Sequence, residues 1–411
     1  MNNLRINAIW YTIGLTLNSF NSLFFLIIIN RVNGVDTAGI FSFAFSIACL
    51  LYIVGIYSGR VYQVSDLSGE LNDYEYLIHK IMTCSIAFPI AIIFIIIKDY
   101  SVKKNIIIIL LTIYKCFESF SDVFYGFLQK NEKLYIVGKS LSYKTICGVV
   151  IFLATDYITN NILLSCSLLV LNSLFWTVFY DIRKSMKLVS ISSYDFIKII
   201  KFFKVSFSVF AFMFLSVYIV NVPKYIMDIL LSNSFQTIFG IIIMPATVVS
   251  LCGQYIVAPF VTQMTNYYNR EEYNGFNKLV IKLLALLLAI GIVIEICSAF
   301  FGIPVLSILY AIDLRKYWID LMIIMIGAIC YALAGIISTA MITMRANNGQ
   351  FLIYSIDALV GTIIGYFLIS TFGIHGATYS YVITMIIHVL MYLVYYTYYI
   401  RKLLKKTNKV T

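Results

Sequence analysis

The stretch Ile81–Ile97, IMTCSIAFPIAIIFIII, decides the fold class of this chain because its 17 residues include no charged side chain. An apolar helix of about 20 residues crosses the hydrocarbon core of a bilayer. The chain of 411 residues is 61% hydrophobic and only 12% charged, whereas soluble proteins carry about 25% charged residues. This composition excludes a soluble enzyme, a disordered chain, a coiled coil and a disulfide scaffold, and it predicts a polytopic membrane protein.

Twelve apolar blocks of this kind follow one another along the chain. They are Ile6–Ile29, Gly39–Tyr57, Ile81–Ile97, Asn105–Gly126, Tyr135–Ala154, Ile162–Tyr180, Val205–Leu231, Ile238–Val261, Leu279–Phe300, Tyr317–Thr343, Phe351–Ser370 and Ala377–Ile400. No long stretch alternates apolar and polar residues as a transmembrane barrel requires. Hydrogen-bonded helices are the other way to cross lipid, so an all-α protein with twelve transmembrane helices is expected.

A weak internal repeat divides these blocks into two halves. Asn21 and Asn221, Asn33 and Asn233, and the segments 61–65 and 261–265 all match at an offset of 200 residues. Six helices per half give both halves the same orientation, as in transporters with parallel repeats. We therefore predict two parallel six-helix lobes around a central cavity. The predicted divisions are an N-terminal lobe (1–180), a basic cytoplasmic linker (181–204), a C-terminal lobe (205–400) and a basic cytoplasmic tail (401–411).

The distribution of Lys and Arg predicts the orientation. Placing both termini on one side puts 20 basic residues there and 6 on the other side. Cytoplasmic loops carry the excess of positive charge, so both termini should be cytoplasmic. The net charge of +11 is then explained by topology and anionic lipid, and no nucleic-acid partner is expected.

Several ionisable residues lie inside the predicted spans, where each costs roughly 2.5–3.5 kcal/mol unless it faces protein or water. They are Lys115, Glu118 and Asp122 in the fourth span, Lys139 and Lys144 in the fifth, Lys224 and Asp228 in the seventh, Glu295 in the ninth and Asp357 in the eleventh. The four lysines are staggered in depth and could pass an anionic head group across the bilayer, since lysine suits phosphate as a compact charge. The acids could bind a coupling cation or balance the lysines.

Structural roles stay open for the same residues. The alternatives are mutual neutralisation (Lys115 with Glu118, Lys224 with Asp228), snorkelling to the interface (Lys139) and neutral helix contacts (Glu295, Asp357). The apolar surroundings of His388 favour a packing residue over a proton relay. Arg31 and Arg60 could simply anchor helix ends. The chain has no Gly-rich phosphate loop, metal-ligand spacing or nucleophile motif, so neither an enzyme nor a cofactor is expected.

Four segments, in their order along the chain, resemble one membrane-protein family. They are RVNGVDTAGIFS (31–42), GRVYQVSD (59–66), KCFESFSDVFYGFLQK (115–130) and NVPKY (221–225). With the span count, they are similar to the O-antigen and polysaccharide flippases of the multidrug/oligosaccharidyl-lipid/polysaccharide (MOP) exporter superfamily.

The resemblance implies a bacterial inner (plasma) membrane protein that moves undecaprenyl-diphosphate-linked oligosaccharide from the cytoplasmic to the outer leaflet by alternating access. Coupling to H⁺ or Na⁺, and association with a polysaccharide polymerase and chain-length proteins, are expected in the same way. The diphosphate would be held by Lys115, Lys139, Lys144 and Lys224, where many relatives use arginine. Arg31, Asp36 and Arg60 fall in segments that match gating or interlobe loops.

Two other functions are compatible with a polytopic chain. A multidrug antiporter of the same superfamily would need a predominantly acidic cavity, which the staggered lysines disfavour. A membrane polysaccharide polymerase would need a large outer loop, and the predicted outer loops are short.

Overall fold

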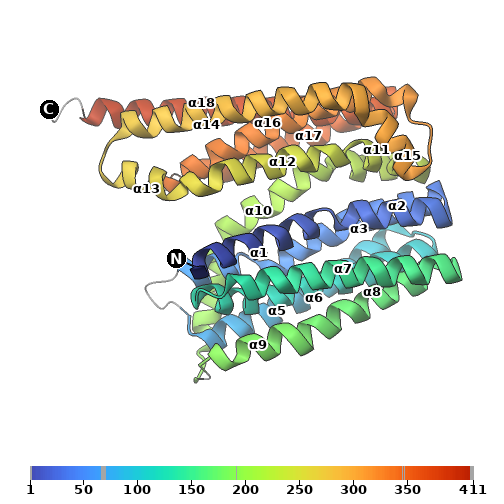
Figure 1. The fold of residues 1–411 in the computed structure, drawn as a ribbon, viewed down its shortest axis with the longest axis horizontal. Helices are drawn as coiled ribbons and strands as arrows, with labels where there is room; N and C mark the ends of the chain where they lie inside the picture. Colours follow the sequence, from blue (N-terminus) through green and yellow to red (C-terminus); the bar gives the residue numbers. More distant parts are fainter. Residues whose placement is uncertain (1, 66–70, 191, 345, 347, 408–411) are drawn as a thin grey trace. The chain divides into compact units, whose positions relative to one another are not determined.

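The computed structural model describes residues 2–65, 71–190, 192–344, 346 and 348–407, and every regular element among these is helical. Contacts divide the chain into two units, Met1–Val217 and Tyr218–Thr411. The division falls inside one long helix, α10 (Phe196–Leu230), and not in the segment 181–204 that the sequence marks as a linker. Figure 1 colours the first unit blue to green and the second yellow-green to red.

The first unit contains helices α1 to α9 and the first part of α10. They are α1 (Asn2–Ser19), α2 (Asn21–Asn33), α3 (Val35–Ile56), α4 (Gly59–Ser65), α5 (Asp73–Lys98), α6 (Val102–Lys130), α7 (Leu134–Thr159), α8 (Ile162–Trp176), a π-helical turn at Thr177–Ile182, α9 (Arg183–Ser185) and a 3₁₀ turn at Met186–Leu188.

The second unit continues from α10. Its helices are α11 (Asn233–Ile242), α12 (Met244–Val257), a 3₁₀ turn at Ala258–Phe260, α13 (Val261–Asn269), α14 (Tyr273–Cys297), a π-helical turn at Ser298–Gly302, α15 (Ile303–Tyr310), a 3₁₀ turn at Arg315–Tyr317, α16 (Trp318–Thr343), α17 (Asn348–Phe372) and α18 (Ile374–Thr407).

The predicted membrane spans all fall within helices. Eleven helical segments of the described residues are long and apolar enough to cross a membrane with few charges. The remaining predicted span, Asn105–Gly126, lies in α6, whose 29 residues are also long enough but carry six Lys, Asp or Glu side chains. The most highly charged span is therefore the strongest candidate for a functional role.

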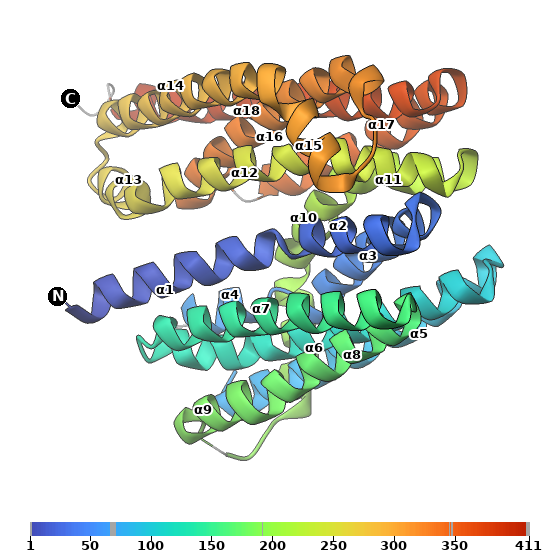
Figure 2. The same ribbon diagram turned by 45° about the vertical axis from the view of Figure 1, so that its right-hand side comes forward.

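Helices α1 and α7 pack unusually closely, and Figure 2 shows α1 running alongside α7. A Cβ atom placed on Gly138 would lie 2.1 Å from the backbone oxygen of Trp10, and one on Gly14 would lie 2.4 Å from the backbone oxygen of Gly138. Only glycine allows two helix backbones to approach this closely. The contact fixes the position of α7 and its lysines against α1.

A sharp corner joins α3 to the short helix α4. Tyr57 and Ser58 both have left-handed backbone conformations, with φ of 41° and 59°, which cost roughly 1–2 kcal/mol per non-glycine residue. Packing compensates for this cost, because the Tyr57 ring stacks on Phe210 of α10 with centroids 4.2 Å apart and Ser58 is fully buried. The corner therefore holds the first turn of α4, which begins with Gly59 and Arg60, in a defined position.

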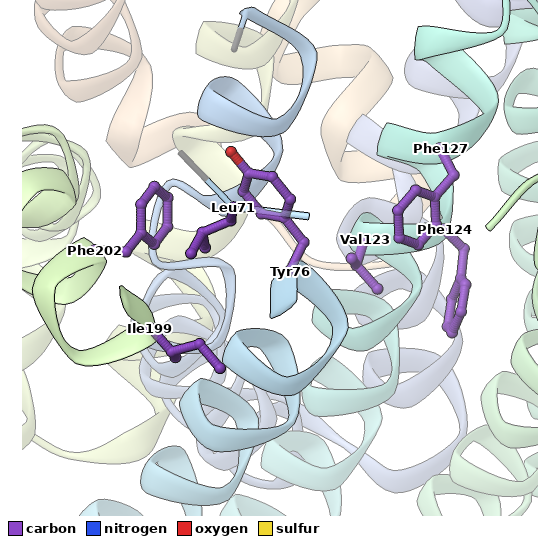
Figure 3. Packing of buried hydrophobic residues seen from close by; sticks show 7 residues of the cluster. All are labelled: Leu71, Tyr76, Val123, Phe124, Phe127, Ile199 and Phe202. Carbon is purple, nitrogen blue, oxygen red and sulfur yellow. The ribbon is translucent and has the colours of Figure 1, made fainter. Parts of the chain in front are cut away.

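An apolar cluster holds α5, α6 and α10 together at this end of the first unit (Figure 3). It consists of Leu71, Tyr76, Val123, Phe124, Phe127, Ile199 and Phe202, each at most 5% exposed. The start of α5 beside it is set by a capping box, in which Asn72 and Glu75 each accept a hydrogen bond from the other's backbone amide. Lys80 consequently lies two turns inside α5.

In the second unit, α17 and α18 form an antiparallel pair with a very short connection. Gly373 has φ of 60°, and a Cβ on Gly376 would lie 2.0 Å from the backbone oxygen of Leu368. The tight connection brings the middle of α17 opposite the middle of α18, where Asp357 and His388 meet.

Candidate functional site

Charged side chains of the first unit gather in the interior of its helix bundle. We call this group the polar core of the first unit; it contains Arg60, Lys80, Lys115, Glu118, Asp122, Lys139, Lys144 and Asp181. Six of the eight belong to the candidate residues identified from the sequence. Lys80 and Asp181 are additions from the structure.

Lys144 of α7 is fully engaged by neighbouring groups. Its ammonium lies 2.6 Å from a carboxylate oxygen of Asp181 and donates hydrogen bonds to the hydroxyls of Ser121 and Thr177 at 2.6 and 3.1 Å. The π-helical turn at the end of α8 carries both Thr177 and Asp181. Side-chain exposures of 7% for Lys144 and 0% for Asp181 make this a buried pair with no net charge.

Lys115 of α6 is also neutralised. Its ammonium lies 2.6 Å from a carboxylate oxygen of Glu118, one turn further along the helix. The rings of Phe45, Tyr52 and Tyr114 surround the ammonium at 4.9, 5.6 and 5.2 Å from their centroids. The pair is enclosed by aromatic side chains, which agrees with the alternative in which Lys115 and Glu118 neutralise each other.

Asp122 of α6 has two cationic neighbours. Arg60 approaches it at 3.4 Å and Lys80 at 3.6 Å. Lys80 is 1% exposed and donates to the backbone oxygens of Gly55 and Ile56, so it is held at the end of α3. The carboxylate of Asp122 thus balances only one of the two positive charges.

Arg60 is the most accessible member of this trio, with 17% of its side chain exposed. Its Nε and Nη2 both donate to the side-chain oxygen of Gln129, at 3.0 and 2.7 Å. Nη2 also lies 3.4 Å from the hydroxyl of Tyr11 on α1. The guanidinium is therefore fixed between α6 and α1 but retains an exposed edge.

Lys139 of α7 lies near the same turn of α1. Its ammonium stands over the rings of Trp10 and Tyr135, at 5.1 and 5.7 Å from their centroids, an arrangement that stabilises a cation. Among the described residues no carboxylate lies within ion-pair distance of it. Arg60 contacts Tyr11 and Lys139 contacts Trp10, so the two cations flank adjacent residues of one helix.

The polar core of the first unit therefore has a net positive charge. It contains five cations and three carboxylates, and the Lys115 and Lys144 pairs account for two of each. The two excess positive charges belong to the Arg60, Lys80 and Asp122 group and to Lys139.

The other two residues of the predicted gating set lie elsewhere. Arg31 is in the last turn of α2 and Asp36 in the first turn of α3, and both are exposed. Arg60 follows the far end of α3, whose 22 residues span roughly 33 Å. The structure therefore does not bring these three residues together.

The predicted ionisable residues of the second unit are dispersed over three helices. Lys224 and Asp228 are half-buried on α10, and Glu295 is half-buried on α14. Asp357 is fully buried, and one of its carboxylate oxygens lies 2.6 Å from Nδ1 of His388, which is 1% exposed. His388 packs against aromatic rings, as expected, but it is also half of an ion pair that the sequence did not indicate.

The missed residues have different explanations. Lys80 lies one residue before the predicted span Ile81–Ile97, although the Asn-x-x-Glu signature at 72–75 places it inside α5. Asp181 is one residue beyond the predicted end of its span at Tyr180. Only the need of a buried lysine for a counter-charge pointed to it, and that does not identify the partner.

Known proteins resemble this chain in sequence and in fold. No family model matches the chain. A capsular polysaccharide biosynthesis protein, CapF, from Staphylococcus aureus is 24% identical over 377 residues, which cover 90% of this chain and 93% of that protein. The lipid II flippase MurJ in an inward closed conformation superposes with a TM-score of 0.69 at 17% identity, covering 94% of this chain and 87% of MurJ. An inward-facing multidrug resistance MATE transporter of the MOP superfamily gives a TM-score of 0.68 at 12% identity, covering 96% and 99%.

The chain has the fold of these two transporters. The resemblance to flippases of the MOP superfamily is confirmed at the level of the fold, as is the all-helical membrane architecture. Because a flippase and a multidrug transporter match this MOP fold about equally well, the fold does not distinguish their substrates. The site has to do so.

Proposed function

We propose that this protein is a flippase that moves a lipid-diphosphate-linked oligosaccharide, of the undecaprenyl type, from the cytoplasmic to the outer leaflet of a bacterial inner membrane. The observation that carries the proposal is the net positive charge of the polar core of the first unit, in which Arg60 and Lys80 share the single carboxylate of Asp122 and Lys139 has aromatic neighbours. A buried excess of positive charge is costly without an anionic ligand. A diphosphate head group supplies two negative charges.

The chemistry of the two side chains suits this ligand. Arginine presents a planar set of donors that matches phosphate oxygens, and lysine adds a compact charge. Trp10 and Tyr11 separate them on α1 with ring surfaces that suit the apolar faces of a sugar. Lys80 contributes to this site indirectly, because it shares the carboxylate of Asp122 with Arg60.

The predicted lysines divide accordingly. Lys139 is retained as a diphosphate ligand, with Arg60 as its partner. Lys115 and Lys144 are assigned to buried pairs that hold the helices together. Lys224 belongs to the second unit and is not assigned to this site.

A multidrug antiporter remains the main alternative, since MATE transporters share the fold. Export of cationic drugs requires a negative site, and a net positive polar core repels them. The similarity to a capsular polysaccharide biosynthesis protein favours the same choice. The proposed setting is a multi-pass protein with both termini cytoplasmic, acting alongside a polysaccharide polymerase and chain-length proteins.

Binding of undecaprenyl diphosphate to the purified protein in nanodiscs tests the proposal by native mass spectrometry. Each charged contact is worth roughly 1.5–3 kcal/mol, so Arg60→Gln and Lys139→Gln should each weaken binding by roughly 10- to 150-fold. Lys130→Gln is the matched control, because Lys130 is half exposed and pairs only with Asp73 at 3.7 Å.

In cells, deletion of the gene should remove surface polysaccharide and leave lipid-linked units on the inner leaflet, and the Lys130→Gln protein should restore export. Retention of undecaprenyl diphosphate by the Arg60→Gln/Lys139→Gln double variant at the wild-type level would refute the assignment.

A further inference from the structure

The most deeply buried ion pair of the second unit joins α17 to α18. Asp357 and His388 are 0% and 1% exposed, and Nδ1 of His388 lies 2.6 Å from Oδ2 of Asp357. An ionised carboxylate can only accept hydrogen bonds, so Nδ1 carries a hydrogen and donates it. The other carboxylate oxygen, Oδ1, has no hydrogen-bond partner among the described residues.

The immediate surroundings of the pair are aromatic. The ring centroids of Tyr331, Tyr354 and Tyr392 lie 5.7, 4.8 and 4.9 Å from that of His388. The other ionisable side chains on the helices packed around α17 and α18 are Asp320 of α16, Lys278, Lys282 and Glu295 of α14, and Lys224 and Asp228 of α10. Asp320 has its own partner in His375, and Lys278 and Lys282 are exposed.

A cavity of about 160 Å³ lies within the second unit, beside two tyrosines that contact His388. Its lining includes Ser250 and Gln254 of α12, Ser338 and Thr339 of α16, and the same Tyr331 and Tyr354 that contact His388. Cavities of this size lined by hydroxyl and amide groups hold ordered water. Tyr331 and Tyr354 therefore contact both His388 and a cavity large enough to hold water.

Proton accounting identifies the atom that can titrate. With Asp357 ionised, Nδ1 keeps its hydrogen in both states, and the exchangeable proton is the one on Nε2 of His388. When Nε2 is protonated, imidazolium and carboxylate cancel each other. When that proton leaves, one uncompensated negative charge remains in a site where the Oδ1 atom of Asp357 has no donor. Burying such a charge costs several kcal/mol, so loss of the proton favours a conformation in which water reaches the carboxylate.

Sodium is a poorer candidate for the same place. Hard cations require several oxygen ligands, whereas Asp357 is fully buried and its Oδ2 is engaged by an imidazole nitrogen, which leaves only Oδ1 without a hydrogen bond among the described residues. Among the described residues no cluster of three or more His, Cys, Asp and Glu side chains offers a metal site.

We propose that His388 and Asp357 form a proton-binding site of the second unit, reached through the cavity beside Tyr331 and Tyr354. Resting on the proposed flippase function, this makes H⁺ the coupling ion. One proton bound at His388 Nε2 favours the closed packing of α17 against α18, and its release favours hydration and opening of that packing.

Charge movement after a pH jump tests the proposal with the proton as the only ligand. Protein in liposomes of phosphatidylethanolamine and phosphatidylglycerol is adsorbed on a solid-supported membrane and stepped from about pH 8 to about pH 6, on either side of the ordinary histidine pKa. The wild type should give a transient current that His388→Gln and Asp357→Asn reduce to the level of protein-free liposomes. His375→Gln is the matched control on α18, because His375 pairs with Asp320 but is half exposed.

Two results would overturn the proposal. One is an undiminished pH-jump current in both pair variants. The other is a current that follows a sodium jump at constant pH and disappears in those variants, which would make the site a sodium site.

A second measurement leaves the pair intact, in case its variants fail to fold. The chain has three histidines, and His79 lies fully buried among aromatic rings, where no described residue forms a hydrogen bond with either ring nitrogen. The His79→Phe/His375→Gln protein therefore leaves His388 as the single histidine for ¹⁵N NMR. Nε2 should gain a proton when the sample is acidified; a ring that stays neutral at every pH at which the protein remains folded would refute the assignment. Neither measurement contains a lipid-linked substrate, so its result is independent of the Arg60 and Lys139 binding test.

Discussion

Replacement of Lys144 by methionine should destabilise the first unit severely. The substitution leaves Asp181, which is 0% exposed, as a buried carboxylate without its counter-charge. Removing one partner of a buried pair typically costs about 3–5 kcal/mol. For a unit of about 200 residues, each kcal/mol lowers the unfolding midpoint by about 2–4 °C, so a fall of roughly 6–20 °C is expected.

The measurement is the apparent Tm of detergent-purified protein, with the amount of fluorescently tagged protein in membranes as a second readout. Lys139→Met is the matched control on the same helix, because Lys139 has aromatic neighbours and no carboxylate partner among the described residues. It should lower the stability by less than about 1 kcal/mol. The double variant Lys144→Met/Asp181→Asn removes both charges and should recover most of the loss.

The result that refutes this reasoning is specific. If Lys144→Met retains the wild-type Tm and membrane level but no longer flips its substrate, the ammonium is available to the ligand. The sequence-based assignment of Lys144 to the diphosphate would then be preferred over the buried pair.

Two further predictions concern helix packing and capping. Gly138→Leu should abolish accumulation of folded protein in membranes, because even its Cβ would lie 2.1 Å from the Trp10 backbone oxygen and overpacking costs about 1–3 kcal/mol or more. Gly335→Ala, with no atom within 4 Å of the added Cβ, should accumulate normally, and equal accumulation of both variants would contradict the α1–α7 contact. Asn72→Ala removes the capping box of α5 and should cost about 1 kcal/mol, measured as a Tm about 2–4 °C lower; an unchanged Tm would mean that the cap contributes nothing.

The helices were predictable because insertion into lipid depends on local composition. A run such as Ile81–Ile97 has to become a buried or lipid-facing helix whatever its neighbours are. The α3–α4 corner was not predictable, since neither Tyr57 nor Ser58 is a residue type that usually adopts left-handed backbone geometry. Stacking on Phe210, about 150 residues later, stabilises it, and such a contact leaves no local signal.

The candidate site was predictable in its residue types but not in its pairings. The spacings of three and four residues between Lys115, Glu118 and Asp122 put them on one face of a helix, and the Lys115–Glu118 contact follows from the spacing of three. The partner of Lys144 depends on how α7 packs against the end of α8, and the partners of Asp122 depend on how α4 and α5 pack against α6. The sequence therefore indicated how much charge was buried, whereas the structure shows which charges remain unbalanced.

The corner before Arg60 has a practical consequence for cutting this protein into halves. A fragment that stops in the segment 181–204 would contain every member of the polar core of the first unit but lack Phe210, and Tyr57 would lose its stacking partner. Such a fragment should be synthesised and inserted into the membrane, but the corner before Arg60 would lack the contact that stabilises it. Co-expressed fragments that reconstitute a working transporter should instead be divided after α10, so that Tyr57 and Phe210 stay on the same fragment.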